Sequence, residues 1–180
     1  MTTLACGLRQ GEALALRWKD VDLEFGELHI RATLQRFDGQ WAFPEPKSKQ
    51  SRRRIPLPAT AARALRDHRA RQWAERLKAG ALWEDWDLVF ATHTGGPLSA
   101  RNVVRSFKEV LTKHGMRQQR FHDLRHGCAS LLAASGASLS EAKEILGHSQ
   151  IAITANLYIH IYEKAKRDAM DRMDDVLARA

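Results

Sequence analysis

Four side chains between residues 121 and 158 have the chemistry needed to act on a phosphate ester: His122, Arg125, His148 and Tyr158. His122 and Arg125 are three residues apart, so on a helix they project from the same face. Arginine presents a planar, permanently charged fork that suits phosphate oxygens, and histidine transfers protons near neutral pH. Tyrosine is among the side chains that form covalent intermediates. This combination predicts chemistry on a phosphodiester, with Tyr158 as candidate nucleophile.

Tyr158 has two competing interpretations. A lone tyrosine is more often a core aromatic than a nucleophile, but Tyr158 follows His148 at a short distance and is itself followed by His160. Tyr162 lies one helical turn later and is the obvious competitor for the same role. We assign Tyr162 instead to the apolar stripe of a final amphipathic helix over 162–177.

Two cations near the start of the chain are candidates to complete the site. Arg9 stands at the expected start of a helix, where the macrodipole disfavours a cation, and this misfit favours a functional role. Glu12, one turn later, is placed to hold the Arg9 side chain, although an ordinary ion pair would look the same. Lys47 lies in a basic loop within reach of a leaving oxygen. Taken alone, Lys47 would be interpreted as a solvated loop lysine.

The charge of the chain favours a polyanionic partner. Its 180 residues suit one compact domain, and 29 Lys and Arg against 21 Asp and Glu give a net charge of +8. Nucleic acid is the first candidate and an acidic membrane surface the second. There is no apolar run that could cross a bilayer and no secretory leader, so we expect a cytoplasmic protein. Cys6 and Cys128 are expected to be reduced core residues, with one disulfide as the alternative.

A small antiparallel sheet is expected in the first third of the chain. Alternating apolar residues over 27–34, the turn at Asp38-Gly39 and a short strand over 41–43 predict a hairpin. The basic loop 47–54 follows, and 55–57 has the pattern of an edge strand.

Helices are expected to dominate the remaining chain. The segment 59–79 has helical periodicity, with inward positions at Ala62, Leu65, Trp73 and Leu77. The short segment 88–91 is expected to be an isolated strand.

Capping residues predict further helices. Ser99 is a suitable N-cap for a helix to about residue 113, and Ser138 with Glu141 forms a capping box for a helix ending at Leu146-Gly147. The helix that carries Arg125 has an expected core-facing stripe of Leu124, Cys128, Leu131 and Leu132. The predicted fold is therefore α+β and mainly α, a small antiparallel β-sheet packed on a helical bundle, as one domain over 1–180.

The candidate residues occur in motifs that resemble those of the tyrosine recombinase (phage integrase) family. The motifs are CGLRQGE with Arg9, PKSKQSRRR with Lys47, HDLRH with His122 and Arg125, LGHS with His148, and LYIH with Tyr158. They follow the family's order and spacing across nearly the whole chain. The most specific part is HDLRH followed by LGHS and by a tyrosine ten residues after its histidine.

The resemblance implies a catalytic domain that acts on double-stranded DNA through a covalent 3′-phosphotyrosyl intermediate. Tyr158 would attack the scissile phosphate, and Arg9 and Arg125 would bind its non-bridging oxygens. His148 would add a hydrogen bond, and His122 would assist proton transfer.

The basic loop would supply the remaining roles. Lys47 would protonate the departing 5′ oxygen, with Lys49 as the alternative. Lys49, Arg52 and Arg53 are expected DNA contacts. The resemblance implies no metal or other cofactor. It also implies other recombinase protomers as partners, as a tetramer on synapsed DNA, and a bacterial or phage-encoded protein at the nucleoid.

The chain departs from the family at its start. Family members usually carry an extra helix and a separate DNA-binding domain before the first catalytic arginine, whereas Arg9 is preceded by eight residues. We therefore expect both to be absent and the chain to be a catalytic-domain fragment.

Three other interpretations compete with this one. A helix-turn-helix binder is suggested by the two helices of 130–148, but it leaves Arg9 and Tyr158 unexplained. A zinc hydrolase is suggested by the spacing of His122 and His126, but Asp123 replaces the required Glu. A type IB topoisomerase shares the tyrosine chemistry, but the spacing of the motifs here is that of integrases.

Overall fold

The computed structural model describes residues 1–46 and 51–148, and part of the segment that follows. In that segment the described residues are 155, 158, 159, 163, 166, 167, 170–175, 177 and 178. Lys47, Lys49 and Tyr162 therefore lie outside the described residues.

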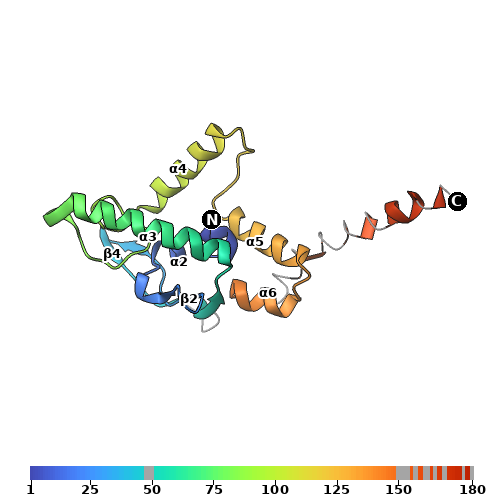
Figure 1. Ribbon diagram of the computed structural model, residues 1–180, viewed down its shortest axis with the longest axis horizontal. Coiled ribbons are helices and arrows are strands. Elements are labelled where there is room, and N and C mark those ends of the chain that lie inside the picture. The colour runs from blue at the N-terminus through green and yellow to red at the C-terminus, as the bar shows by residue number, and fades with distance from the viewer. Residues whose placement is uncertain are drawn as a thin grey trace.

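Helices make up most of the regular secondary structure in the described residues. They are α1 (Thr2–Cys6), α2 (Gln10–Leu14), α3 (Ala59–Ala79), α4 (Ala100–Lys113), α5 (Asp123–Ala134) and α6 (Leu139–Leu146), with 3-10 turns η1 (Trp18–Asp20) and η3 (Gly80–Leu82). The short α1 contacts α2, α3 and α5, and α6 contacts both α5 and the sheet. Helix α4 projects away from the other elements, and the helical residues 170–175 lie beyond α6 (Figure 1).

The strands form two small antiparallel sheets instead of the single sheet expected. The first has the order β1 (Val21–Asp22), β2 (Glu27–Ile30), β5 (Arg53–Pro56), and the second pairs β3 (Gln35–Phe37) with β4 (Gln40–Ala42). The Asp38-Gly39 turn does join a hairpin, with Phe37 opposite Gln40. The predicted strand over 27–34 does not continue into this hairpin. The chain leaves the first sheet after Ile30, and the Leu34 backbone N–H donates to the Gly11 carbonyl of α2 at 2.8 Å.

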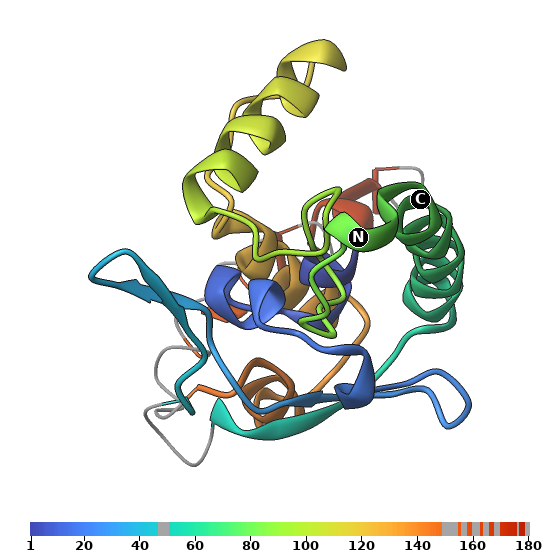
Figure 2. The same cartoon turned by 90° about the vertical axis from the view of Figure 1, so that its left-hand side faces the viewer.

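The main core lies between α1, α2, α3 and the first sheet (Figure 2). Cys6, Leu8, Leu28, Ile55 and Leu65 are at most 1% exposed. Each large aliphatic side chain contributes about 1.5–3 kcal/mol through burial. Both cysteines are buried and free, as predicted. Burial, followed by the proximity of the Cys128 thiol, raises the pKa of Cys6 to about 12.

Helix α3 has the predicted bounds, but its C-terminal half does not face the core. Ala62 and Leu65 are buried as predicted, whereas Trp73 is 54% and Leu77 is 79% exposed. The N-terminal half of α3 packs in the main core, and further along the helix the inward residue is Gln72, which donates to the Leu88 carbonyl at 3.0 Å. The prediction for Trp73 and Leu77 was therefore wrong.

Apolar residues of two further helices are only partly buried. In α4, Leu111 is buried but Val110 is 52% exposed, because this helix projects from the body. In α5, Cys128 is buried but Leu131 is 58% exposed. The segment 88–91 forms isolated bridges, Arg17 with Leu88 and Ala91 with Pro97, instead of a strand. In the part of the chain that the structure describes, we find no helix with the length and hydropathy of a membrane span.

Candidate phosphate-binding site

Arg9 is positioned by the turn between α1 and α2. Gly7 ends α1 with φ 58°, a left-handed conformation that favours glycine, and a Cβ at this position would come within 2.5 Å of the Leu146 side chain of α6. Arg9 is the N-cap of α2, and its backbone N–H donates to Glu12 at 2.9 Å. The Arg9 guanidinium also donates to Glu12, at 2.7 Å. Glu12 therefore holds both the backbone and the guanidinium of Arg9.

Arg125 lies inside the protein at the start of α5. It is 3% exposed, and it donates to the Gly7 carbonyl and to the Leu146 carbonyl, each at 2.5 Å. Helix α5 thereby connects the Gly7 turn to the end of α6. His122, three residues earlier, is the N-cap position of α5.

Three arginines converge on the C-terminal end of α6. Each donates to one of three consecutive carbonyls: Arg53 Nε to Ile145 O at 2.7 Å, Arg125 Nη2 to Leu146 O at 2.5 Å, and Arg9 Nη2 to Gly147 O at 3.1 Å. The last carbonyls of a helix lack partners within the helix and carry partial negative charge, so they attract cations. His148 follows directly, after the left-handed Gly147 cap with φ 64°.

Glu12 is a carboxylate that accepts hydrogen bonds from two of these arginines, Arg9 and Arg53. It is 3% exposed, and the Arg53 fork donates to both of its oxygens at 3.1 Å. Burial alone would raise the pKa of Glu12, but the hydrogen bonds and charge of Arg53 and the hydrogen bonds of Arg9 hold that pKa below its usual value.

The group formed by Arg9, Arg53, Arg125 and Glu12 has a formal charge of +2, since it contains three guanidiniums and one carboxylate. Burial and the charge of Arg9 lower the pKa of Arg125 to about 9, so Arg125 remains charged at pH 7. The Arg9 side chain is 38% exposed, whereas that of Arg53 is 6% exposed. Arg9 therefore forms the solvent-facing part of a site suited to an anion.

Both candidate histidines have lowered pKa values. Burial, followed by the charges of Arg125 and Arg9, lowers the pKa of His148 to about 4, so its ring is neutral at pH 7. A neutral imidazole still donates one N–H bond. Burial, followed by the charge of His126, lowers the pKa of His122. The rings of His122 and His126 meet edge to face at 5.0 Å between centroids.

Tyr158 is 1% exposed and forms an apolar cluster with Ala133 and Ala142. Ala133 and Arg125 lie near opposite ends of α5, eight residues apart, which is about 12 Å of helix rise. The ring therefore packs toward the end of α5 that is farther from Arg125.

The basic loop residues have different surroundings. Arg52 is exposed and pairs with Glu45 at 3.0 Å. Arg53, an expected DNA contact, opens β5, and its guanidinium bonds to Glu12 with 6% of the side chain exposed. The period of two along a strand places Arg53 on the same face as buried Ile55, and this signal identifies it once the strand is extended by two residues.

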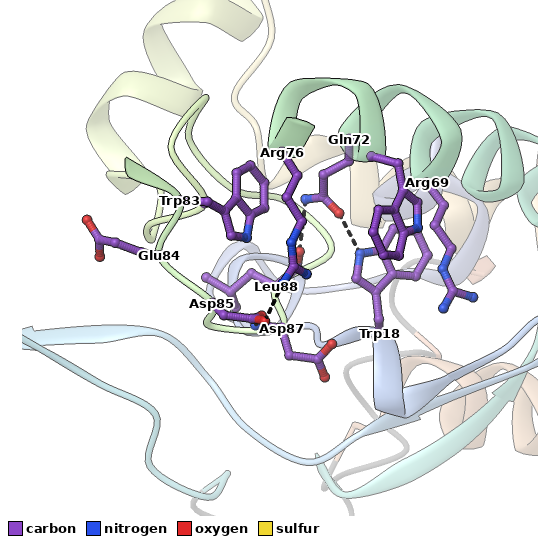
Figure 3. A pocket seen from close by; sticks show the side chains of 11 residues that line it. Trp18, Arg69, Gln72, Arg76, Trp83, Glu84, Asp85, Asp87 and Leu88 are labelled. Atoms are coloured by element: carbon purple, nitrogen blue, oxygen red, sulfur yellow. Dashed lines mark hydrogen bonds and ion pairs between the residues drawn. The ribbon is translucent and has the colours of Figure 1, made fainter. Parts of the chain in front are cut away.

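A recess beside α3 gathers three indoles but does not resemble a reaction site. Its volume is about 100 Å³, and several of its polar groups bond to one another (Figure 3). Trp18 donates to Gln72 at 2.6 Å, and Arg76 pairs with Asp85 at 2.9 Å. Arg76 also stacks over the Trp73 ring at 5.4 Å. Among the described residues, no three His, Cys, Asp or Glu side chains converge as metal ligands.

The arginine cluster has the charge and the hydrogen-bond donors that suit an anion such as a phosphate. Residues 1–165 match the model of the phage integrase family, and the chain belongs to this family. Within described residues the fold is the α+β, mainly helical arrangement predicted from the sequence.

Named relatives include recombinases and integrases. The chain is 36% identical to a tyrosine recombinase XerC-like protein of Caldanaerobacter subterraneus subsp. tengcongensis, over 94% of this chain and 46% of the relative. It is 29% identical to the ICEBs1 integrase of Bacillus subtilis, over 95% of this chain and 46% of the relative. The chain thus spans about half the length of these relatives.

Solved structures share the fold. The Tn1549 transposon integrase, solved in complex with transposon right end DNA, superposes with a TM-score of 0.76 at 24% identity, over 96% of this chain and 56% of that one. XerA recombinase superposes with a TM-score of 0.72 at 21% identity, again over 96% and 56%.

Proposed function

We propose that this chain is the catalytic domain of a tyrosine-type site-specific recombinase that cleaves and rejoins double-stranded DNA. The observation that carries the proposal is the cluster of Arg9, Arg53 and Arg125 at the end of α6, which contains one carboxylate, Glu12, and in which only Arg9 is substantially exposed. Such a cluster has excess positive charge, held in fixed positions in a poorly solvated site, where electrostatic stabilisation of a phosphoryl transition state is strongest. Family membership and the DNA-bound Tn1549 integrase support DNA as the source of that phosphate.

In the proposed reaction, the Tyr158 oxygen attacks the scissile phosphorus while the bond from phosphorus to the 5′ oxygen breaks. Arg9 and Arg125 neutralise the non-bridging oxygens, and the neutral His148 ring donates a hydrogen bond to one of them. The lowered pKa of His122 keeps its ring largely neutral near pH 7, and a neutral imidazole has a nitrogen that can accept the tyrosine proton.

Lys47 would donate a proton to the departing 5′ oxygen, with Lys49 as the alternative donor. The result is a 3′-phosphotyrosyl bond and a free 5′ hydroxyl. Attack by the 5′ hydroxyl of another strand reverses the step and exchanges DNA partners.

Tyr158 must leave its apolar cluster to reach the phosphate, because its side chain is 1% exposed. We propose that assembly on DNA, as a tetramer on two synapsed sites, accompanies this movement and places the protein at the nucleoid. Arg52 and Lys49 would contact the DNA backbone, which makes affinity fall with rising salt.

A suicide DNA substrate tests the proposal. A library of flanking sequences, nicked near the phosphate to be cleaved, is mixed with the chain at low salt and without metal. We expect a covalent protein–DNA species on a denaturing gel for wild type and for Tyr162→Phe, and its loss in Tyr158→Phe.

The alternative results identify the competing functions. DNA binding that is unchanged by Tyr158→Phe, with no covalent species from any protein, would contradict the recombinase and favour a non-catalytic binder. A covalent species lost in Tyr162→Phe but kept in Tyr158→Phe would reassign the nucleophile.

A further inference from the structure

Arg53 joins three parts of the phosphate site that come from distant segments of the chain. From β5, its Nη1 and Nη2 donate to the two Glu12 oxygens of α2 at 3.1 Å, and its Nε donates to the Ile145 carbonyl of α6 at 2.7 Å. Its Nη1 also donates to the Ser51 carbonyl at 3.2 Å, close to the loop that carries Lys47. The Arg53 guanidinium therefore bonds both to the Glu12 carboxylate and to backbone carbonyls.

The partners of Arg53 are themselves bonded to groups that would face the phosphate. Glu12 holds the guanidinium of Arg9 at 2.7 Å. The Ile145 carbonyl lies two residues before Gly147, whose carbonyl accepts from Arg9 at 3.1 Å. A shift of Arg53 would therefore change the Arg9 position from two directions.

The burial of Arg53 separates it from a phosphate ligand. Its side chain is 6% exposed, compared with 38% for Arg9, and its N–H groups point at Glu12 and at backbone carbonyls. A planar guanidinium can bond to both Glu12 oxygens and to the Ile145 carbonyl at once, whereas a lysine ammonium cannot.

We propose that Arg53 is a positioning residue of the phosphate site, which orients Arg9 through Glu12 and fixes the end of α6 from which His148 projects. This inference rests on the recombinase function proposed above. It replaces the expectation that Arg53 contacts DNA directly. Misplacement of catalytic groups by about 1 Å can cost about 10²-fold in rate.

The kinetic test separates positioning from DNA contact. At saturating suicide substrate we expect Arg53→Met to slow covalent-complex formation by about 10²-fold, and Arg53→Lys by about tenfold, because only the charge is kept. The dissociation constant for DNA should change by less than about threefold. Arg54→Met is the matched control, since Arg54 is the next residue of β5 and is exposed; its rate should equal that of wild type.

A second readout does not depend on DNA cleavage. In ¹H–¹⁵N spectra of the chain without DNA, the signals of the Arg9 Nε–H and of the Gly147 and His148 amides should move in both Arg53 variants and stay in place in Arg54→Met. Near-UV circular dichroism confirms that each variant is folded, and Arg53→Lys is the variant for this comparison if Arg53→Met does not fold.

The two readouts distinguish the two proposals. Moved signals in the Arg53 variants, with no covalent species even from wild type, would support the positioning role and contradict the recombinase function. Unmoved signals in Arg53→Lys would overturn the positioning role. The positioning role would also be overturned if the Arg53 variants cleaved at the wild-type rate but bound DNA more weakly, with a salt dependence reduced by about one phosphate contact. That is the behaviour of a direct DNA contact.

Discussion

The Glu12 carboxylate should be worth several kcal/mol to the folded state. Four N–H groups donate to its two oxygens, from the Arg9 backbone at 2.9 Å, the Arg9 guanidinium at 2.7 Å, and the Arg53 fork at 3.1 Å on each side. In Glu12→Gln, an NH₂ group replaces one oxygen and meets donors instead of accepting from them. The cluster also loses its negative charge while three guanidiniums remain.

Removal of one partner from a buried ion pair typically costs about 3–5 kcal/mol. Because Gln keeps the shape and one acceptor oxygen, we expect the lower end, a loss of about 3 kcal/mol at pH 7. In a domain of this size such a loss lowers Tm by about 6–12 °C. Urea unfolding at pH 7, followed by circular dichroism, measures the loss; Glu45→Gln, at the exposed Arg52 pair, should change stability by less than about 1 kcal/mol.

The pH dependence provides a check on the cause. The pKa of Glu12 is lower in the folded state than in the unfolded chain, so its contribution is present above the ordinary value of 4.5 and is lost as the pH falls through the folded pKa. The stability difference between wild type and Glu12→Gln should therefore shrink on acidification. A difference below about 1 kcal/mol at pH 7, or one independent of pH, would refute this reasoning.

Two other predictions concern the end of α6. His148 has a folded pKa of about 4 against an ordinary value of 6.5, so the unfolded chain binds more protons between these values and stability falls as the pH falls through this range. From pH 7 to pH 5 the free energy of unfolding should therefore fall less in His148→Gln than in wild type, and an equal fall would contradict the lowered pKa of His148. Gly7→Ala combines a left-handed φ of 58° with a Cβ 2.5 Å from Leu146, and it should cost about 2–3 kcal/mol. Gly39→Ala, with φ 80° and nothing near its Cβ, should cost only about 1 kcal/mol; equal costs for the two glycine variants would show that the close approach has no energetic consequence.

The sequence predicted the elements of the fold well where local signals were strong. Helix α3 has the predicted bounds of 59–79, and the capping box of Ser138 and Glu141 is present at the start of α6. The faces of the helices were predicted less well. Trp73 and Leu77 have the periodicity of core residues but are exposed, because periodicity does not reveal where the neighbouring elements end.

The arrangement of the site could be predicted only in part, for a related reason. Residue types and motif spacing were sufficient to nominate Arg9, Glu12 and Arg125 as a group. Their common partner was not predictable, because the bonds to the end of α6 join residues 138, 92 and 21 positions apart in sequence. The inward direction of Arg53 likewise depended on where β5 begins.

The most direct test of the proposed function is to identify the amino acid that becomes linked to DNA. Wild-type protein is trapped on the suicide substrate library, digested with nuclease and protease, and analysed by tandem mass spectrometry. We predict a peptide in which Tyr158 carries a nucleotide through its 3′ phosphate. A nucleotide on Tyr162 or on another residue would contradict the proposed nucleophile, and unmodified Tyr158 in protein that has cleaved DNA would contradict the phosphotyrosyl mechanism.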